Sequence, residues 1–351
     1  MSILRKIPNP VFLSLLTGSV ALAWVVPDWG RSGGYLQAEK LIPAGILYIF
    51  LAQGLLLPLS SVGKELRSWQ THLLTQGIIF LGIPLLTMGL LLVFGKYLEP
   101  DLRLGLLFLS VLPTTIATAV IFTNTAGGAV TTALFNTVTA NVAGVVVVPF
   151  AMAYLASATT GMGIDPWPVL QRISLLILLP LFLGIILQNW LHDWATRHGR
   201  TLRRLQNGVI FFTVFSVFSD SVADGFWREQ GWHPVLVALL ATTILLVVVH
   251  GGLGFLCRSL PWPLPERIAV FFCASQKTIA AGVPMAHVLF LGVADATKSP
   301  HLGMLLLPLM FYHFLQLVVG GVIAERWGQR MHPQATHPPP APPAKDNRPS
   351  G

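Results

Sequence analysis

Long apolar segments recur along the whole chain, and they constrain its fold more than any other feature. A membrane-spanning helix needs about 20 mainly apolar residues, and ten segments are long enough to cross a bilayer, either directly or as an interrupted pair. Charged residues make up only 10% of the 351 residues, against about 25% in soluble domains. The sequence therefore predicts an all-α integral membrane protein with ten transmembrane helices. The ten segments are 11–27, 41–59, 71–94, 102–126, 128–156, 169–190, 206–222, 234–256, 268–291 and 302–323.

Basic residues are unequally distributed between the two sides of these segments. Fourteen Lys and Arg residues fall on the side of the N-terminus and seven on the other side, and the cluster Arg197–Arg204 is the strongest determinant. Since cytoplasmic loops are enriched in Lys and Arg, we expect both termini in the cytoplasm. The location is then the plasma membrane, which is the inner membrane in a Gram-negative bacterium. The net charge of +8 reflects this topology, and we expect no nucleic-acid partner.

The first segment also resembles a cleavable signal, because Arg5 and Lys6 precede its apolar run. No clear small-residue cleavage site follows it, so we expect an uncleaved first helix. Five segments then lie on each side of a loop near Ser157–Trp167. An odd number of helices in each half makes the two halves inverted relative to each other. We expect one five-helix repeat over 1–160, a second, inverted repeat over 161–330, and a disordered Pro-rich tail over 331–351.

Lys277 lies near the middle of the ninth segment. About ten helical residues on either side place it on the order of 15 Å from each membrane face, which is farther than a lysine side chain reaches. A charge at this depth costs at least about 2.5 kcal/mol and usually serves a function. Gly282 and Pro284 interrupt the same segment, and the polar run 114–141 interrupts an earlier one, a pattern that points to a transporter binding site. The other interpretation is a lysine paired with carbonyls or a carboxylate for structure alone.

Threonine and asparagine residues crowd the run 114–141, beside Gly127–Gly128. Hard cations such as Na⁺ prefer oxygen ligands, which hydroxyls, amides and freed backbone carbonyls supply. Thr132 and Asn136 are four residues apart and therefore share a helix face, which we expect to be turned toward the binding site. Small hydroxyl residues also serve helix packing in lipid, and that explanation suffices for any single threonine.

Four further polar residues are accessory site candidates. Asp220 and Asp224 stand four residues apart at the outer end of the seventh segment, where a surface or capping role competes with a role in substrate or proton binding. His313 and Gln316 lie in the tenth segment. A membrane histidine of this kind is either packed and hydrogen-bonded or functional.

Six short motifs follow one another in a specific order and spacing. They are Pro113-Thr-Thr-Ile-Ala-Thr-Ala-Val, Ala126-Gly-Gly-Ala-Val-Thr-Thr-Ala, Phe215-Ser-Val-Phe-Ser-Asp, Ser275-Gln-Lys-Thr, Gly282-Val-Pro-Met-Ala and Leu307-Pro-Leu-Met-Phe-Tyr-His-Phe-Leu-Gln. In these residues the chain resembles the bile acid:sodium symporter family, and most of all its symporter-like branch. The resemblance extends from about Pro8 to Trp327. It implies two inverted five-helix repeats, with a panel domain facing a core domain whose broken fourth and ninth helices cross.

The resemblance also implies a set of site residues. In the bile acid members of the family, two Na⁺ ions sit at the helix crossing. Carried over to this chain, Thr118, Thr132 and Asn136 fall on oxygen-ligand positions of the fourth helix, and Gln276 falls on a ligand position of the ninth. We expect no metal other than Na⁺ at these four residues.

Three other family positions differ here. Phe272 stands where the family has an acidic ligand, and Ala119 and Lys277 stand where it has asparagines. The loss of a carboxylate and the gain of an ammonium make the site more positive, and Na⁺ beside Lys277 would be repelled. We therefore expect transport that is linked to H⁺ or uncoupled, since a buried lysine can release and rebind a proton.

Together these features predict a secondary active transporter that moves a small solute, an organic anion, across the lipid bilayer. The positive ends of half-helices at the crossing favour anions. The coupling ion is Na⁺ or H⁺, and we expect no other cofactor. Because common hydrolase and nucleotide-binding motifs are absent, we expect neither an enzyme nor an ATP-driven pump. The rival interpretation is a membrane protein that transports nothing itself and regulates cation flux.

Overall fold

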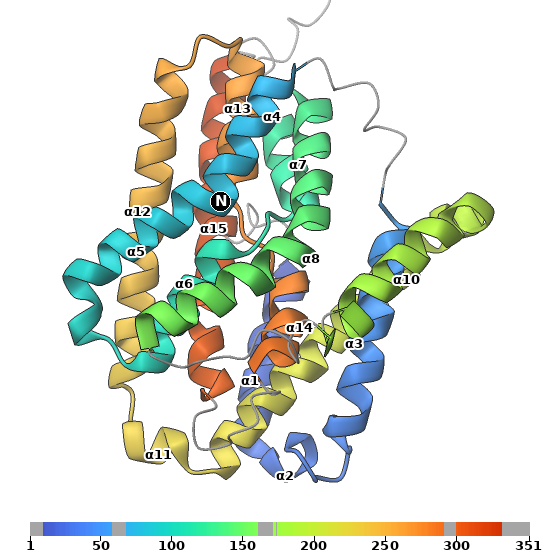
Figure 1. Ribbon diagram of the computed structural model, residues 1–351, viewed down its shortest axis with the longest axis vertical. Coiled ribbons are helices and arrows are strands. Elements are labelled where there is room, and N and C mark those ends of the chain that lie inside the picture. Colours follow the sequence, from blue (N-terminus) through green and yellow to red (C-terminus); the bar gives the residue numbers. More distant parts are fainter. Residues whose placement is uncertain (1–9, 58–67, 161–170, 173, 291–299, 332–351) are drawn as a thin grey trace, which may run out of the picture.

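Helices form all of the regular secondary structure in the described residues, and no strand occurs among them. The computed structural model describes residues 10–57, 68–160, 171–172, 174–290 and 300–331 (Figure 1). Seven helical stretches are long and apolar enough to cross a membrane, or eight if one sharply bent pair counts as a span. The all-helical membrane fold is confirmed, although these helices do not correspond one to one with the ten expected segments.

The helices fall on either side of the undescribed stretch 161–170. Before it lie α1 (Pro10–Val25), α2 (Pro27–Gly30), α3 (Ala38–Leu55), α4 (Trp69–Gly77), η4 (Ile78–Gly82), α5 (Ile83–Phe94), η5 (Gly95–Tyr97), α6 (Pro100–Val111), α7 (Ile116–Thr125) and α8 (Val130–Thr160). After it lie η6 (Ser174–Leu178), α10 (Leu179–Ala223), α11 (Phe226–Gln230), α12 (His233–Ser259), α13 (Leu264–Ser275), α14 (Ile279–Phe290) and α15 (Leu302–Met331). The expected repeat boundary at 160/161 falls at this gap, and residues 332–351 of the expected tail lie outside the described residues.

The longest helix, α10, contains the second part of the sixth expected segment, from Leu179 on, and all of the seventh. It cannot be straight, because Gly184 packs against Gly54 of α3 while Val209 packs against Gly45 of α3. A straight helix would separate Gly184 from Val209 by about 37 Å, whereas Gly45 and Gly54 are only about 13 Å apart along α3. The two halves of α10 therefore run past α3 in different directions.

The turn of α10 lies between Gln188 and Gly199. Gln188 donates a hydrogen bond to the Leu55 carbonyl at 3.1 Å, and Gly199 lies beside Leu56. The basic cluster Arg197–Arg204 begins here, and we had expected it to form a loop between two helices. No proline occurs in this stretch to break the backbone ladder, and arginine and leucine are good helix formers. The charged residues thus do not end the helix.

Two groups of helices are visible in Figure 1. α1 and α3 pack along α10, whereas α6, α12 and α13 pack against or beside α15. α14 contacts both α10 and α15. Its position places the second half of the ninth segment between the two groups.

The ninth segment is interrupted, although not where its sequence suggests. α13 and α14 are separated by Gln276–Thr278, whereas Gly282 and Pro284 both lie inside α14. A Cβ at Gly282 would come within 2.7 Å of the side chains of Leu112 and Leu309. This glycine therefore allows close packing between helices, and the expectation that it breaks the helix is wrong.

The fourth segment is interrupted at Leu112–Thr115, where the axes of α6 and α7 differ by 60°. A residue that precedes proline avoids the helical conformation, and Leu112 is extended, with φ −63° and ψ 146°. The ring of Pro113 packs on Gly144 of α8, where a Cβ would come within 2.8 Å of it. Pro113 therefore ends α6, and Gly144 leaves room for the interrupted backbone.

Candidate functional site

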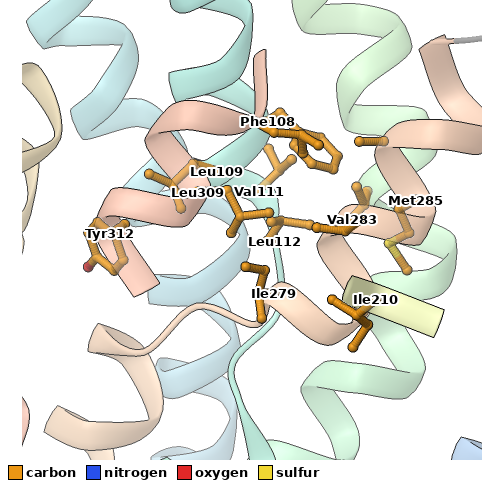
Figure 2. Close-up of a cluster of buried hydrophobic side chains, with 14 of the residues drawn as sticks. Phe108, Leu109, Val111, Leu112, Ile210, Ile279, Val283, Met285, Leu309 and Tyr312 are labelled. Carbon is orange, nitrogen blue, oxygen red and sulfur yellow. The ribbon is translucent and has the colours of Figure 1, made fainter. Parts of the chain in front are cut away.

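The two interruptions meet inside the protein. The backbone N–H of Thr278 donates to the Pro113 carbonyl at 3.0 Å, and Figure 2 shows Leu112 beside Ile279. Four helix ends are therefore close together. The C-terminal ends of α6 and α13 carry partial negative charge, and the N-terminal ends of α7 and α14 carry partial positive charge.

Lys277 lies in this crossing, with 1% of its surface exposed. Its ammonium donates to the carbonyl oxygens of Ser110 at 2.6 Å, Leu112 at 2.7 Å and Ile79 at 3.4 Å. The carbonyls at the end of a helix lack intrahelical partners, and a cation there is favoured by the helix dipole. An ammonium has three donors, so these three carbonyls use its full capacity. Lys277 thus occupies a cation position at the negative end of α6.

Gln316 of α15 fixes the backbone of Lys277 from both sides. Its Oε1 accepts from the Lys277 N–H at 2.7 Å, and its Nε2 donates to the Lys277 carbonyl at 2.8 Å. The same Nε2 lies 2.9 Å from Nδ1 of His313. The interruption of the ninth segment has no proline of its own, and this side chain supplies the partners that a continuous helix would otherwise provide.

Lys277, His313 and Gln316 are therefore brought together as one connected group. Tyr312 belongs to the same face of α15, because its hydroxyl donates to the Ser275 carbonyl at 2.9 Å. We had not expected Tyr312 at the site, although it directly precedes His313 in one of the six motifs. The carbonyl partners of Lys277 were also missed, because a backbone acceptor has no residue-specific signal.

Thr132 and Asn136 lie together on α8, the helix that follows the broken pair. The expectation that they belong to the interrupted fourth helix is therefore wrong. The Asn136 amide donates to the Thr132 carbonyl at 3.0 Å. Gln76 of α4 donates to the Asn136 carbonyl at 3.0 Å and approaches its side-chain oxygen at 3.4 Å. Both residues are buried, so their shared face is turned into the protein.

Asn141 links α8 directly to the interruption in the fourth segment. Its amide donates to the Thr114 and Thr137 carbonyls, both at 2.8 Å. On its other side, its Oδ1 accepts from Gln53 of α3 at 3.4 Å. Asn141 lies in the polar run but was not among our site candidates. One side chain thus connects α3, α8 and the crossing.

Thr118 and Gln276 have different surroundings. Thr118 is half-buried in the first turn of α7, where its hydroxyl hydrogen-bonds that of Thr115. Gln276 is fully buried, and neither atom of its amide has a hydrogen-bond partner among the described residues. A Cβ at Gly320 of α15 would lie 3.2 Å from its Nε2. The described contacts do not join Thr118, Gln276 and the Thr132–Asn136 pair into one ligand shell.

Apolar packing surrounds the two family positions that have lost their oxygen ligands. The Phe272 ring lies 5.6 Å from that of Phe122 and 5.8 Å from that of Trp327. Ala119 packs in a cluster of small residues with Ala133, Ala269 and Cys273. These surroundings provide no charge to balance a bound cation.

Asp220 and Asp224 lie apart from the crossing, at the end of α10. Asp220 accepts from the Ser32 N–H at 2.7 Å and from the Ser32 hydroxyl at 3.1 Å. Asp224 is the exposed residue that follows the last turn of α10. Asp220 therefore ties the loop after α2 to α10, which corresponds to the surface or capping role.

An apolar groove of about 700 Å³ is lined by side chains of α1, α10, α12 and α15. Its lining includes Trp24 and Trp232, whose rings stack 6.0 Å apart, and Phe311 and Phe314 of α15. Phe311 precedes His313 by two residues and Phe314 follows it directly. No group of three or more His, Cys, Asp or Glu residues suited to a metal was found within the described part of the chain.

Residues 10–329 match the SBF-like CPA transporter family. The chain belongs to this family. This family is of the bile acid:sodium symporter type, and its members are transporters and not enzymes. The resemblance that the six motifs indicated is therefore confirmed. Membership in this family implies that the protein lies in a membrane and that its substrate is a small-molecule solute.

Relatives are similar to this chain over nearly its full length. A Pseudomonas aeruginosa protein named only as uncharacterized is 32% identical over 94% of this chain and 96% of its own. The Escherichia coli K12 protein "Putative symporter YfeH" is 30% identical, over 92% and 94%. "Sodium/bile acid cotransporter 7" of Rattus norvegicus is 23% identical, also over 92% and 94%.

Proposed function

We propose that this family member is a secondary active transporter of a small organic anion in which Lys277 holds the place of a coupling cation. The observation that carries the proposal is the set of three carbonyl oxygens around its ammonium. In transporters, carbonyls freed by interrupted helices and the C-terminal ends of half-helices coordinate Na⁺ or H⁺. A resident ammonium in that position removes the need for a bound Na⁺.

Electrostatics supports the same assignment. Two unit charges 4 Å apart repel each other by about 4 kcal/mol at an effective dielectric constant of 20. A Na⁺ ion beside Lys277 would meet this repulsion without the acidic ligand that Phe272 replaces. A lysine can release its proton inside a protein, whereas arginine stays charged. Proton exchange at Lys277 could therefore take the part that Na⁺ binding has in bile acid symporters.

The solute would bind beside Lys277 and not directly to its ammonium, whose donors are already used. The N-terminal ends of α7 and α14 offer partial positive charge for an anionic group. Gln276, which has no partner among the described residues, offers a free amide. The apolar groove along α15 could accept an apolar part of the same solute.

Alternating access would move the group of α1, α3 and α10 relative to the helices that carry the crossing. Counting α1 and the two directions of α10 as separate membrane passages raises the eight candidate spans to ten. Ten passages agree with two inverted five-helix repeats, 1–160 and 161–330, and with two cytoplasmic termini. A reporter that is active only in the cytoplasm, fused after Gly351, tests the topology; a stable but silent fusion would refute it.

The decisive experiment is uptake of organic anions into proteoliposomes under an imposed pH gradient or an imposed Na⁺ gradient. We expect the pH gradient to drive uptake at zero Na⁺. Lys277→Gln should remove the dependence on pH, and Lys277→Arg should fail as well, because arginine does not release its proton. Uptake driven by Na⁺ alone at fixed pH, and unchanged in Lys277→Gln, would refute the assignment of Lys277.

The rival function, regulation of cation flux without transport, is kept because Lys277 is also fully satisfied as a purely structural group. The two functions differ in the same assay. A regulator reconstituted alone would move no organic anion under either gradient, while the variants would retain their fold. Uptake that depends on Thr132 and Asn136 excludes this rival.

A further inference from the structure

Three arginines line a pocket at the end of the molecule where α12 ends, α13 begins and α15 ends. Figure 1 shows these helix ends together at the top of the view. The pocket measures about 250 Å³, which is smaller than the roughly 300–1,000 Å³ of drug-sized ligand sites. Its lining consists of Gly254, Cys257, Arg258, Leu264, Arg267, Ile268, Trp327, Arg330 and Met331.

Arg267 lies half-buried in this pocket, and its guanidinium is incompletely bonded. One terminal nitrogen donates to the carbonyls of Cys257 at 3.3 Å and Arg258 at 3.5 Å. Its Nε is buried and has no hydrogen-bond partner in the described parts of the chain. A buried donor without a partner costs about 1–3 kcal/mol, and more on a charged group, so a ligand that accepts from it would be bound favourably.

No acidic residue is among the lining residues. The neighbouring Glu266 is turned to α4, where its carboxylate accepts from the Thr71 hydroxyl at 3.2 Å. Glu325 lies on α15 outside the lining. Arg258 and Arg330 are exposed, so the pocket is lined by two solvent-accessible cations and a third that is half-buried. Among the described lining residues, positive charge is therefore concentrated without an acidic side chain.

We propose that this pocket binds the phosphate group of an anionic ligand. Arginine presents paired donors that match phosphate oxygens, and basic pockets between membrane helices bind the headgroups of anionic lipids. The phosphate can come from a lipid headgroup of the adjacent leaflet or from a soluble organic phosphate. The apolar lining by Leu264, Ile268 and Trp327 suits a ligand with a short apolar portion beside the phosphate.

An anion in this pocket would stabilise the helices that carry the crossing. It would join the ends of α12 and α15 to the start of α13, the helix that ends immediately before the Gln276–Thr278 break. Trp327 lines the pocket and also packs against Phe271, with ring centroids 4.9 Å apart. The site itself is distinct from the Lys277 site, so it does not depend on the coupling mechanism proposed above.

The test uses the full-length purified protein. Its apparent unfolding temperature is measured in detergent with inorganic pyrophosphate, against sodium chloride at equal ionic strength. It is measured again in phosphatidylcholine vesicles with and without phosphatidylglycerol. We expect a saturable rise with pyrophosphate, phosphatidylglycerol or both, since a ligand that binds the native state raises its stability. A response to pyrophosphate indicates a soluble phosphate, and a response to phosphatidylglycerol alone indicates a lipid headgroup.

Arg267→Gln and Arg330→Gln should each weaken binding roughly tenfold, the loss expected for a charge-assisted hydrogen bond. Arg326→Gln is the matched control, because Arg326 is exposed on the same helix as Arg330 but does not line the pocket. If Arg267→Gln fails to fold, the comparison of Arg330→Gln with Arg326→Gln is sufficient to test the proposal. The proposal is overturned if neither ligand acts on the wild type, or if Arg330→Gln and Arg326→Gln respond like the wild type.

Discussion

Two membrane regions of the protein differ in how they satisfy the hydrogen bonds of their backbone. The α13–α14 pair is interrupted, whereas α10 remains helical throughout. α10 stays helical over 45 residues although it turns between Gln188 and Gly199, and 22% of the apolar window in its stretch is buried inside the protein. α13 ends after 12 residues, and 94% of the corresponding window is buried. An unbroken helix satisfies its own backbone and can face lipid, whereas broken backbone is tolerated only inside protein or beside a water-filled cavity.

This difference explains which polar side chains are needed. Around the break, Lys277, Gln316 and Tyr312 supply partners to backbone groups that the missing helical turn leaves free. Along α10 the close contacts are made by glycines, with Gly184 against Gly54. Polar side chains at the crossing therefore hold structure and site together, while those on α10 serve packing or the surface.

The largest effect should come from Gln316→Leu. It leaves both the N–H and the carbonyl of Lys277 without partners in a buried position, at about 1–3 kcal/mol each. We expect a loss of stability of roughly 2–6 kcal/mol and a loss of anion uptake. The measurements are unfolding in detergent, followed by size-exclusion chromatography, and proteoliposome uptake.

The control for this substitution is Gln206→Leu in α10. The Gln206 amide donates to the Ile49 carbonyl at 2.9 Å, and Ile49 lies inside the continuous helix α3. Removing this bond should cost at most about 1.5 kcal/mol, because the carbonyl keeps its place in the helical ladder. Equal losses for the two glutamine substitutions would contradict the distinction between broken and unbroken helices.

A smaller effect is expected from Gly54→Val at the contact between α3 and α10. Its Cβ would meet the Leu181 carbonyl and the backbone of Gly184, and neither can move aside like a flexible side chain. Overpacking of this kind costs typically about 1–3 kcal/mol. Gly208→Ala in α10 has no atom near its Cβ and should instead stabilise by about 0.4–1 kcal/mol. Thermal unfolding of both variants in one detergent tests the predicted difference in sign.

The sequence was sufficient to locate Lys277, because a lysine far from both membrane faces is costly whatever surrounds it. It did not reveal the partners of Lys277, since any residue type can present a carbonyl. Pro113 was the available signal for two of them, because it ends α6 and frees the carbonyls of Ser110 and Leu112. Gly282 was misread because glycine serves helix breaks and close helix packing alike, and only the positions of Leu112 and Leu309 distinguish the two roles.

The alternation of apolar segments and basic clusters in the sequence also did not predict the path of α10. The cluster Arg197–Arg204 predicted a loop between two membrane helices, but charge does not by itself end a helix, and α10 continues through it. The apolar segments thus located most of the candidate spanning stretches, but they did not predict where the helices begin and end. The prediction that Thr132 and Asn136 share a helix face was correct. Their helix was assigned wrongly, because the polar run 114–141 continues across the end of α7 at Thr125 and the start of α8 at Val130.

An effect of about 1 kcal/mol on stability, with a much larger effect on uptake, is expected from Asn136→Ala. The substitution removes one typical hydrogen bond to the Thr132 carbonyl and the side-chain contact with Gln76. Thr132→Ala should also reduce uptake per folded molecule. Leu134 on the same helix is half-buried and packs against the core, so Leu134→Ala should cost less than the roughly 2–5 kcal/mol of a fully buried leucine and leave uptake largely intact. Equal loss of uptake in all three variants would count against this helix face.

The smallest effect should come from Asp220→Asn, at the end of the unbroken helix. The substitution keeps one oxygen that can accept from the Ser32 N–H, and its amide can donate to the Ser32 hydroxyl, so the loss is confined to the charge assistance of two hydrogen bonds. We expect a change in stability below about 1 kcal/mol and uptake equal to that of the wild type. Asp224→Asn, at an exposed carboxylate with no part in the Ser32 contact, is the control and should be silent in both measurements. Unlike Lys277 and Gln316, Asp220 does not satisfy an interrupted backbone. Its role is therefore to anchor the loop after α2 through Ser32. Uptake that is lost in Asp220→Asn while the fold is kept would restore a proton or substrate role for this carboxylate, and polar groups on the unbroken helix would then belong to the transport path.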